Sequence, residues 1–114
     1  MRVPEPSDLV GLFVVEVGER QAWPFIQFCD NDPTPSREVR LYIDTVFDVF
    51  LPALVNVEDP LHRLLALNNL TVGAVEFRRP GLDVSFTDGC RLSISGEAQS
   101  WTTGDIWWLT PWRA

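Results

Sequence analysis

The chain has 114 residues, of which 46% are hydrophobic and 22% charged, a balance typical of one globular domain and not of a disordered chain. Nine basic residues, all of them arginine, stand against sixteen acidic residues and give a net charge of −7. Because phosphate groups need a basic surface, this balance argues against DNA, RNA or an anionic membrane as partner. The sequence shows no apolar run long enough to cross a membrane and no signal-peptide pattern, so we expect a cytoplasmic protein.

The first half of the chain predicts three strands and one long loop. Leu12 to Val17 and Phe25 to Phe28 are rich in β-forming residues, and residues 39–43 alternate apolar and polar side chains. The same alternation permits an extension of the third strand to Val49. Residues 29–38 form a polar loop with two prolines, which a central strand would not accommodate, so we expect a surface excursion there.

The middle of the chain carries the best helix signal. Asp59 is a suitable N-cap and Pro60 fits the first helical position, which predicts a helix over about residues 60–68. A helix this short needs tertiary packing for stability. We therefore expect it to cover the sheet through three leucines on one face: Leu61, Leu64 and Leu65.

The second half predicts a hairpin whose turn length follows from the side-chain pattern. Residues 70–77 read as a strand, and the segments 82–86 and 90–94 alternate apolar and polar residues around Asp88-Gly89. A two-residue loop would set polar side chains opposite apolar ones. A three-residue loop pairs Phe86 with Cys90 and keeps all apolar residues on one face, so we predict that Gly89 adopts the left-handed conformation of a G1-bulge turn.

The two halves also resemble each other. Residues match partners 58 positions later along the chain, and the matches fall in strand-like segments. The matched pairs are Leu9 and Leu67, Leu12 and Leu70, Val14 and Val72, Val17 and Val75, Ile26 and Val84, Phe28 and Phe86, and Asp30 and Asp88. This offset predicts a structural pseudo-repeat, over about residues 9–44 and 67–95 of a single domain spanning residues 1–114.

The C-terminus is rich in tryptophan, with four of the five in the chain between residues 101 and 112. We expect a final strand within about residues 99–112, in which Trp107 and Trp108 point to opposite faces, so that one of them lies outside the core. Tryptophan is enriched at binding hot spots, and loops on rigid scaffolds often carry recognition. The candidate partner-binding residues are therefore Asp30, Asp32, Glu38, Trp107, Trp108 and Trp112.

No catalytic or metal-binding pattern is visible. His62 is the only histidine, and no nucleophile motif accompanies it. Cys29 and Cys90 are expected to be free, buried thiols, and no Cys/His spacing for zinc exists. The acidic loop lacks the glycine and ligand spacing of a calcium hand. We therefore expect no catalytic residue, no cofactor and no metal.

The chain from Glu38 onward resembles a family of small uncharacterised actinobacterial β-rich domains. The likeness rests on residues 82–94, Leu-Asp-Val-Ser-Phe-Thr-Asp-Gly-Cys-Arg-Leu-Ser-Ile, which fit a hydrophobic-x-Phe-x-Asp-Gly-x-x-Leu-x-Ile hairpin. The following Glu-Ala-Trp-like element is altered here to Glu97-Ala-Gln-Ser-Trp101, and residues 110–114 replace a glycine-rich ending. Some families of this appearance are suspected immunity proteins that neutralise polymorphic toxins. The resemblance implies no catalytic residues.

Together these patterns predict an α+β, mostly β fold. We expect an antiparallel sheet or partly open barrel, built from two pseudo-repeated β-meanders with one short helix packed on it. The function we expect is non-enzymatic binding of another protein, most concretely a basic toxin or effector, or self-association. The alternative is a small-molecule binding module with an aromatic-lined pocket between sheet and helix.

Overall fold

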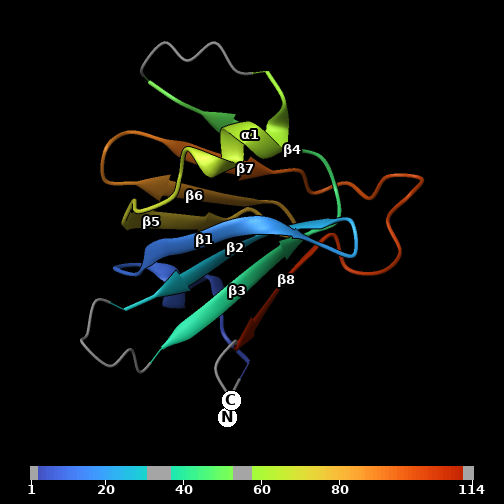
Figure 1. The fold of residues 1–114 in the computed structure, drawn as a ribbon. Helices are drawn as coiled ribbons and strands as arrows, with labels where there is room; N and C mark the ends of the chain where they lie inside the picture. The colour runs from blue at the N-terminus through green and yellow to red at the C-terminus, as the bar shows by residue number, and fades with distance from the viewer. Residues whose placement is uncertain (1–2, 31–36, 53–57, 112–114) are drawn as a thin grey trace.

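The computed structural model describes residues 3–30, 37–52 and 58–111. Their strands form two four-stranded antiparallel sheets, sheet A in the order β1-β2-β3-β8 and sheet B in the order β4-β7-β6-β5 (Figure 1). The elements in chain order are η1 (Pro6–Leu9), β1 (Phe13–Arg20), β2 (Trp23–Cys29), β3 (Glu38–Ile43), β4 (Phe47–Phe50), α1 (Pro60–Leu65), β5 (Val72–Phe77), β6 (Leu82–Phe86), β7 (Arg91–Ile94) and β8 (Trp107–Pro111).

The hydrophobic core draws on both sheets. Alternate residues of each strand are buried in it, so the period-two pattern of the sequence becomes the inner face of each sheet. The buried inner positions include Ile26, Leu41, Leu109, Val84, Leu92 and Val49. This arrangement confirms the mostly β class with one short helix. The described strands make two separate sheets and not a closed barrel.

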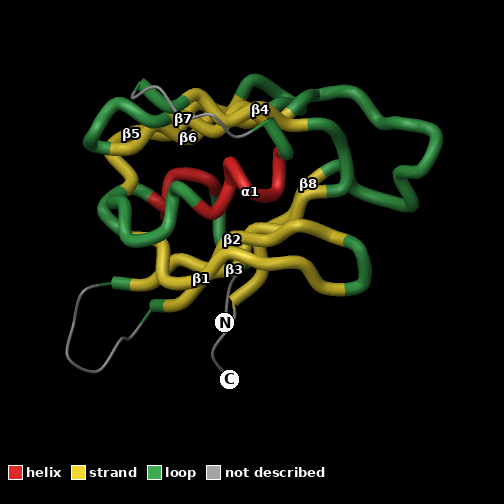
Figure 2. Tube along the Cα trace, turned by 45° about the horizontal axis from the view of Figure 1, so that its top comes forward, coloured by secondary structure: helices red, strands yellow, loops and turns green. Residues whose placement is uncertain are grey.

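Helix α1 lies between the two sheet layers and contacts β1 of sheet A and β4 of sheet B (Figure 2). The Asp59 carboxylate accepts a hydrogen bond from the Leu61 backbone N at 3.2 Å, which confirms the predicted N-cap. The helix ends at Leu65 and not at residue 68. The backbone N–H groups of residues 66–68 each donate to the carbonyl of the third preceding residue, which is the pattern of a tighter 3-10 turn. That tightening buries Leu67 beside Leu64 and leaves Leu65 45% exposed, so the prediction of one shared leucine face is wrong for Leu65.

The hairpin between β6 and β7 has the predicted three-residue loop. Val84 pairs with Leu92 and Leu82 with Ile94, all on the buried face. The Phe86 backbone N donates to Cys90 O at 2.9 Å, and Gly89 has a φ of +95°. The apolar alternation therefore fixed the register, and the left-handed glycine closes the turn.

The strand registers of the two halves match at the offset of 58 residues. Val17 pairs with Ile26 in the first half, and their counterparts Val75 and Val84 pair in the second. Both hairpins carry an irregularity at the same place, after Val14 in β1 and after its counterpart Val72 in β5. Two chain segments with equal pairing and an equal bulge are one structural unit used twice.

The two units meet about a pseudo-two-fold axis. Phe13 forms an antiparallel bridge with Thr71, which is its own counterpart in the repeat. Two matching backbone hydrogen bonds flank this bridge: Val14 N to Leu70 O at 2.9 Å, and Val72 N to Leu12 O at 2.8 Å. The turns before them also match, because Gly11 and Asn69 both have positive φ, at 89° and 72°.

Each unit gives its fourth strand to the other. After Ile43 the chain crosses from sheet A to sheet B, where β4 pairs with β7. After Ile94 it crosses back, and β8 pairs with β3. Matching bonds mark the crossings, Asp44 N to Ile106 O and Ser95 N to Val46 O. The permitted extension of the third strand to Val49 is therefore wrong, because the alternation continues through residue 49 in a different sheet.

Candidate binding face

The outer surface of sheet A carries a cluster of aromatic side chains, which we call the aromatic face: Trp23, Phe25, Tyr42 and Trp108. Tyr42 stacks on Trp108 with ring centroids 5.2 Å apart and an interplanar angle of 20°. Trp23 meets Trp108 edge to face at 5.1 Å and 87°. Cross-strand pairing places them, because Tyr42 lies opposite Phe25 on one side and Trp108 on the other.

The pseudo-repeat provides a comparison for this face within the same molecule. The inner positions are apolar in both sheets, as a shared core requires. The outer row Phe25, Tyr42 and Trp108 corresponds through the strand pairing to Asp83, Ser93 and Asp48 on sheet B. The fold thus accepts small polar residues at these outer positions. Aromatic rings there are not a requirement of the fold, which makes sheet A's outer surface the best candidate for a binding face.

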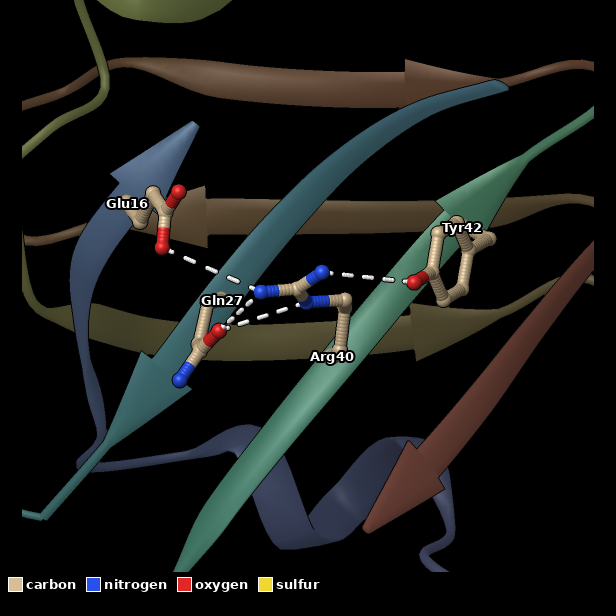
Figure 3. Close-up of polar contacts among 4 residues, drawn as sticks. All are labelled: Glu16, Gln27, Arg40 and Tyr42. Atoms are coloured by element: carbon tan, nitrogen blue, oxygen red, sulfur yellow. Dashed lines mark hydrogen bonds and ion pairs between the residues drawn. The ribbon is translucent and has the colours of Figure 1, made fainter. Parts of the chain in front are cut away.

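A buried arginine lies beside these rings on the same outer side of sheet A. Arg40 is 4% exposed, and its guanidinium lies 3.9 Å from the centre of the Phe25 ring. It donates to Gln27 Oε1 and, at 3.3 Å, to the Tyr42 hydroxyl, and it approaches Glu16 Oε1 to 3.8 Å (Figure 3). A buried charge is tolerated when its donors are satisfied. These contacts hold the rings of Phe25 and Tyr42, against which the two tryptophans pack.

A glycine lets the aromatic rings lie close to the sheet. A Cβ placed on Gly18 would come within 3.0 Å of the Phe25 ring, because Phe25 lies directly over β1 at that point. The counterpart of Gly18 in the repeat is Glu76, opposite Asp83. The glycine and the ring therefore belong to one arrangement that occurs in sheet A and not in sheet B.

An open depression lies at one end of the aromatic face. It has a volume of about 620 Å³ and is lined by Arg20, Gln21, Trp23, Tyr42, Trp108, Leu109 and Thr110. The β1–β2 turn that forms one wall places Gln21 and Ala22 at φ of 53° and 68°. Turns with positive φ at both central residues normally use Asn-Gly, which tolerate this conformation. Gln21 and Ala22 do not favour it, so the turn is strained.

Trp107 and Trp108 point to opposite faces, as the alternation predicted. Trp108 joins the aromatic face, whereas Trp107 packs against the core, and its indole N donates to Pro80 O at 2.7 Å. Trp107 also meets Phe77 edge to face at 5.5 Å. Both rings are half-buried. Trp107 therefore connects the two sheets, and Trp108 is the one available to a ligand or partner.

The structure separates the acidic candidates from the aromatic ones. Glu38 pairs with Cys29 at one end of the β2–β3 hairpin, and the Asp30 carboxylate accepts a hydrogen bond from Arg37 N at 3.1 Å beside it. Trp23 begins β2 at the opposite end. Asp32 and Trp112 lie outside the described residues. Asp30 and Glu38 therefore lie at the end of the β2–β3 hairpin opposite Trp23.

The long connection between β7 and β8 presents a tryptophan that the sequence analysis did not select. Trp101 is 54% exposed on this connection, which extends beyond the sheets in orange in Figure 1. Asp44, which is 4% exposed, holds it: its carboxylate accepts from Thr103 N at 2.9 Å, and its carbonyl accepts from the Thr102 hydroxyl at 2.7 Å. Trp101 is thus displayed on an anchored loop.

Among the described residues, His62, Cys29 and Cys90 make no hydrogen bond or ion pair with one another. His62 Nδ1 lies 2.7 Å from Asp59 Oδ2 on the exposed surface of α1, and within the described residues its ring bonds no hydroxyl or thiol. Burial raises the pKa of the Cys29 thiol, with help from Glu38 and Asp30. Burial and the Asp88 carboxylate raise that of Cys90 to about 11.

The described residues also contain no metal-binding cluster and no membrane-spanning helix. No three His, Cys, Asp or Glu side chains gather in a group that could hold a metal ion. No helix among these residues has the length and apolar character needed to cross a membrane.

The comparisons with known proteins give no relative. No family model, no curated protein and no solved structure matches this chain.

Besides Trp101, the residues that sequence reasoning missed are Trp23 and Tyr42 of the aromatic face. Trp23 precedes the predicted strand at Phe25, and alternation placed Tyr42 on the outer side of its strand without indicating which rings it would meet. The repeat could have found Trp23, because its counterpart is Gly81.

Proposed function

We propose that this protein is a non-enzymatic binding domain that captures another protein on its aromatic face. The observation that carries the proposal is the contrast between the row Phe25, Tyr42 and Trp108 and its polar counterpart on sheet B. Trp23 and Trp108 are half-buried and rest on the buried rings of Phe25 and Tyr42. Partly exposed Trp side chains on a rigid surface are typical of binding hot spots. The Arg40 contacts hold the rings before binding, which lowers the entropy cost of association.

The partner that best suits this chain is a basic protein, such as the toxins that some families resembling this chain are suspected to neutralise. The net charge of −7 would attract a basic partner over a distance and speed the encounter. Trp101 on its anchored connection offers a second apolar contact, flanked by Glu97 and Asp105 with no basic residue between 95 and 106. Acidic loops would then guide the approach, and aromatic rings would determine the lifetime of the complex.

A photo-cross-linking experiment tests this proposal in cells of the source species. A benzophenone amino acid replaces Gln21, which is exposed beside the aromatic face, or Asp48, which holds the matching outer position on sheet B. We expect one discrete cross-linked protein from position 21 and none from position 48. Adding Trp108→Ala should abolish the product from position 21. The proposal is wrong if that product persists in the Trp108→Ala variant, or if both positions capture the same protein.

The second candidate function is binding of a small molecule, and the open depression favours it. Its volume of about 620 Å³ lies within the usual range for ligand sites, and three rings and three polar side chains line it. This depression lies on the outer surface of sheet A, whereas we had expected a pocket between sheet and helix. The two functions differ in what they predict for the isolated protein, because only the second requires a ligand to bind without a partner.

A further inference from the structure

The depression on sheet A combines flat apolar surfaces with unused hydrogen-bond donors. Trp23 and Trp108 meet at 87°, and Tyr42 stacks against Trp108, so the rings form a corner with two perpendicular walls. Within the described residues, the indole N–H groups of Trp23 and Trp108 make no hydrogen bond, unlike that of Trp107. A flat ligand could stack on one wall and accept from an indole of the other.

Arg20 gives the depression a positive charge. It lies opposite Trp23 across the β1–β2 turn and is the one charged side chain among the described residues that line the depression. Its guanidinium makes no hydrogen bond or ion pair with a described residue. Because the protein as a whole carries −7, this is a local reversal of charge.

The pseudo-repeat shows how Arg20 became available. Its counterpart Arg78 is held by two contacts with Asp83, at 3.1 Å each, and by Ile94 O at 2.9 Å. In sheet A the position of Asp83 is occupied by Phe25, which offers no carboxylate. The same arginine is therefore neutralised within sheet B and left facing an aromatic corner in sheet A. A guanidinium in such a setting suits a carboxylate, which it can bind through two parallel hydrogen bonds.

We propose that the depression binds a small, flat aromatic carboxylate, with its ring stacked in the corner of Trp23 and Trp108 and its carboxylate paired with Arg20. The volume of about 620 Å³ suits a molecule of one or two rings. This inference rests on the second candidate function and names its ligand class.

A titration with matched probes tests the proposal on the intact protein. The probes are 1-naphthoate and the uncharged 1-naphthamide, which share a ring system and differ in charge, and the readout is the ¹H–¹⁵N spectrum of the backbone and indole N–H groups. We expect 1-naphthoate to shift the signals of Trp23, Trp108 and residues 20–22. We also expect it to bind about tenfold more tightly than 1-naphthamide, since a charge-assisted pair is lost with the amide.

Three variants assign the contributions. Arg20→Gln should reduce the affinity for 1-naphthoate to that for 1-naphthamide and leave the amide unchanged. Trp108→Ala should weaken both probes. Arg91→Gln, a change on the outer surface of sheet B, should alter neither, which controls for net charge.

The outcomes that contradict the proposal are distinct. Equal affinity for the two probes, or no effect of Arg20→Gln, would overturn the carboxylate class while leaving small-molecule binding in place. Absence of any shift up to about 10 mM of either probe, a concentration at which even a fragment of this size should bind, would remove both the inference and the second candidate function. Neither result bears on capture of a protein partner, which the cross-linking experiment decides.

Discussion

Gly89 shows how one residue determines a turn. Its φ of +95° lies in the left-handed region, and an added Cβ would contact Pro52 Cγ at an unstrained 3.5 Å. The cost of a substitution there is therefore conformational and not steric. We expect Gly89→Ala to lower the free energy of unfolding by about 1 kcal/mol, measured by urea denaturation.

Gly104 provides the control for this change. It has no positive φ, and nothing lies within 4 Å of an added Cβ. Gly104→Ala should leave the free energy of unfolding within about 0.5 kcal/mol of the original value. Equal effects of the two substitutions would show that the left-handed conformation of Gly89 is not the cause.

The thiol of Cys90 is expected to be slow to react. Burial, followed by the hydrogen bond and charge of Asp88, raises its pKa from 9.0 to about 11. At pH 8 this reduces the thiolate fraction about 100-fold, and the thiolate is the nucleophile. In a Cys29→Ser background, iodoacetamide should therefore modify the folded protein at least about 100-fold more slowly than the urea-unfolded chain. Comparable rates in the two states would contradict the shifted pKa.

The β1–β2 hairpin shows strain at the scale of an element. Its turn places Ala22 at a φ of 68° without the glycine that such turns favour. We expect Ala22→Gly to raise the free energy of unfolding by about 0.5 kcal/mol, because relief of the left-handed strain exceeds the added entropy of the unfolded chain. A fall in the denaturation midpoint would indicate that the turn is unstrained. Ser100→Gly, a change in the β7–β8 connection away from this turn, is the control and should not stabilise the protein.

These elements also show what a sequence can specify. The β6–β7 hairpin was predictable in full, because strict alternation and Asp88-Gly89 together leave one register. The tight β1–β2 turn was not, since Gln21-Ala22 carries no turn signal. The exchange of fourth strands was also hidden: an alternating pattern through Val49 is the same whether a strand continues or crosses to the other sheet.

The candidate site was also predictable only in part. Alternation correctly placed Trp107 and Trp108 on opposite faces, but it could not say which ring lay outside. That choice depends on Tyr42, which reaches Trp108 only through the pairing of β3 with β8. The acidic loop was a reasonable candidate from composition, yet strand pairing places Glu38 at the far end of the hairpin from Trp23.

At the scale of the whole molecule, the pseudo-two-fold arrangement makes each half dependent on the other. Sheet A needs β8 from the second half, and sheet B needs β4 from the first. We therefore expect fragments 1–52 and 58–114, produced together, to associate as a one-to-one complex with the far-ultraviolet circular dichroism of the intact chain. Each fragment alone would leave core residues and a sheet edge exposed. Stable folded monomers of either fragment would contradict this interdependence.

The same arrangement leaves the outer surfaces of the sheets free to diverge. The halves share inner residues such as Leu41 and Leu92, but they differ at outer positions such as Tyr42 and Ser93. Sheet B presents mainly polar side chains there, with one exposed ring, Phe50, beside Arg91. Sheet A presents a cluster of aromatic rings in contact with Arg40. A molecule built in this way can keep one sheet for solubility and use the other for recognition.

Dissociation rate constants test most directly whether sheet A alone carries recognition. They are measured for the non-covalent complex with the partner that cross-linking identifies, and compared between the Trp108→Ala and Asp48→Ala variants. The two residues hold matching outer positions, so each substitution removes one outer side chain from an equivalent strand. We expect Trp108→Ala to dissociate at least about tenfold faster than the original protein, and Asp48→Ala to dissociate at the original rate. Equal dissociation rates for the two variants would contradict the assignment of recognition to the aromatic face.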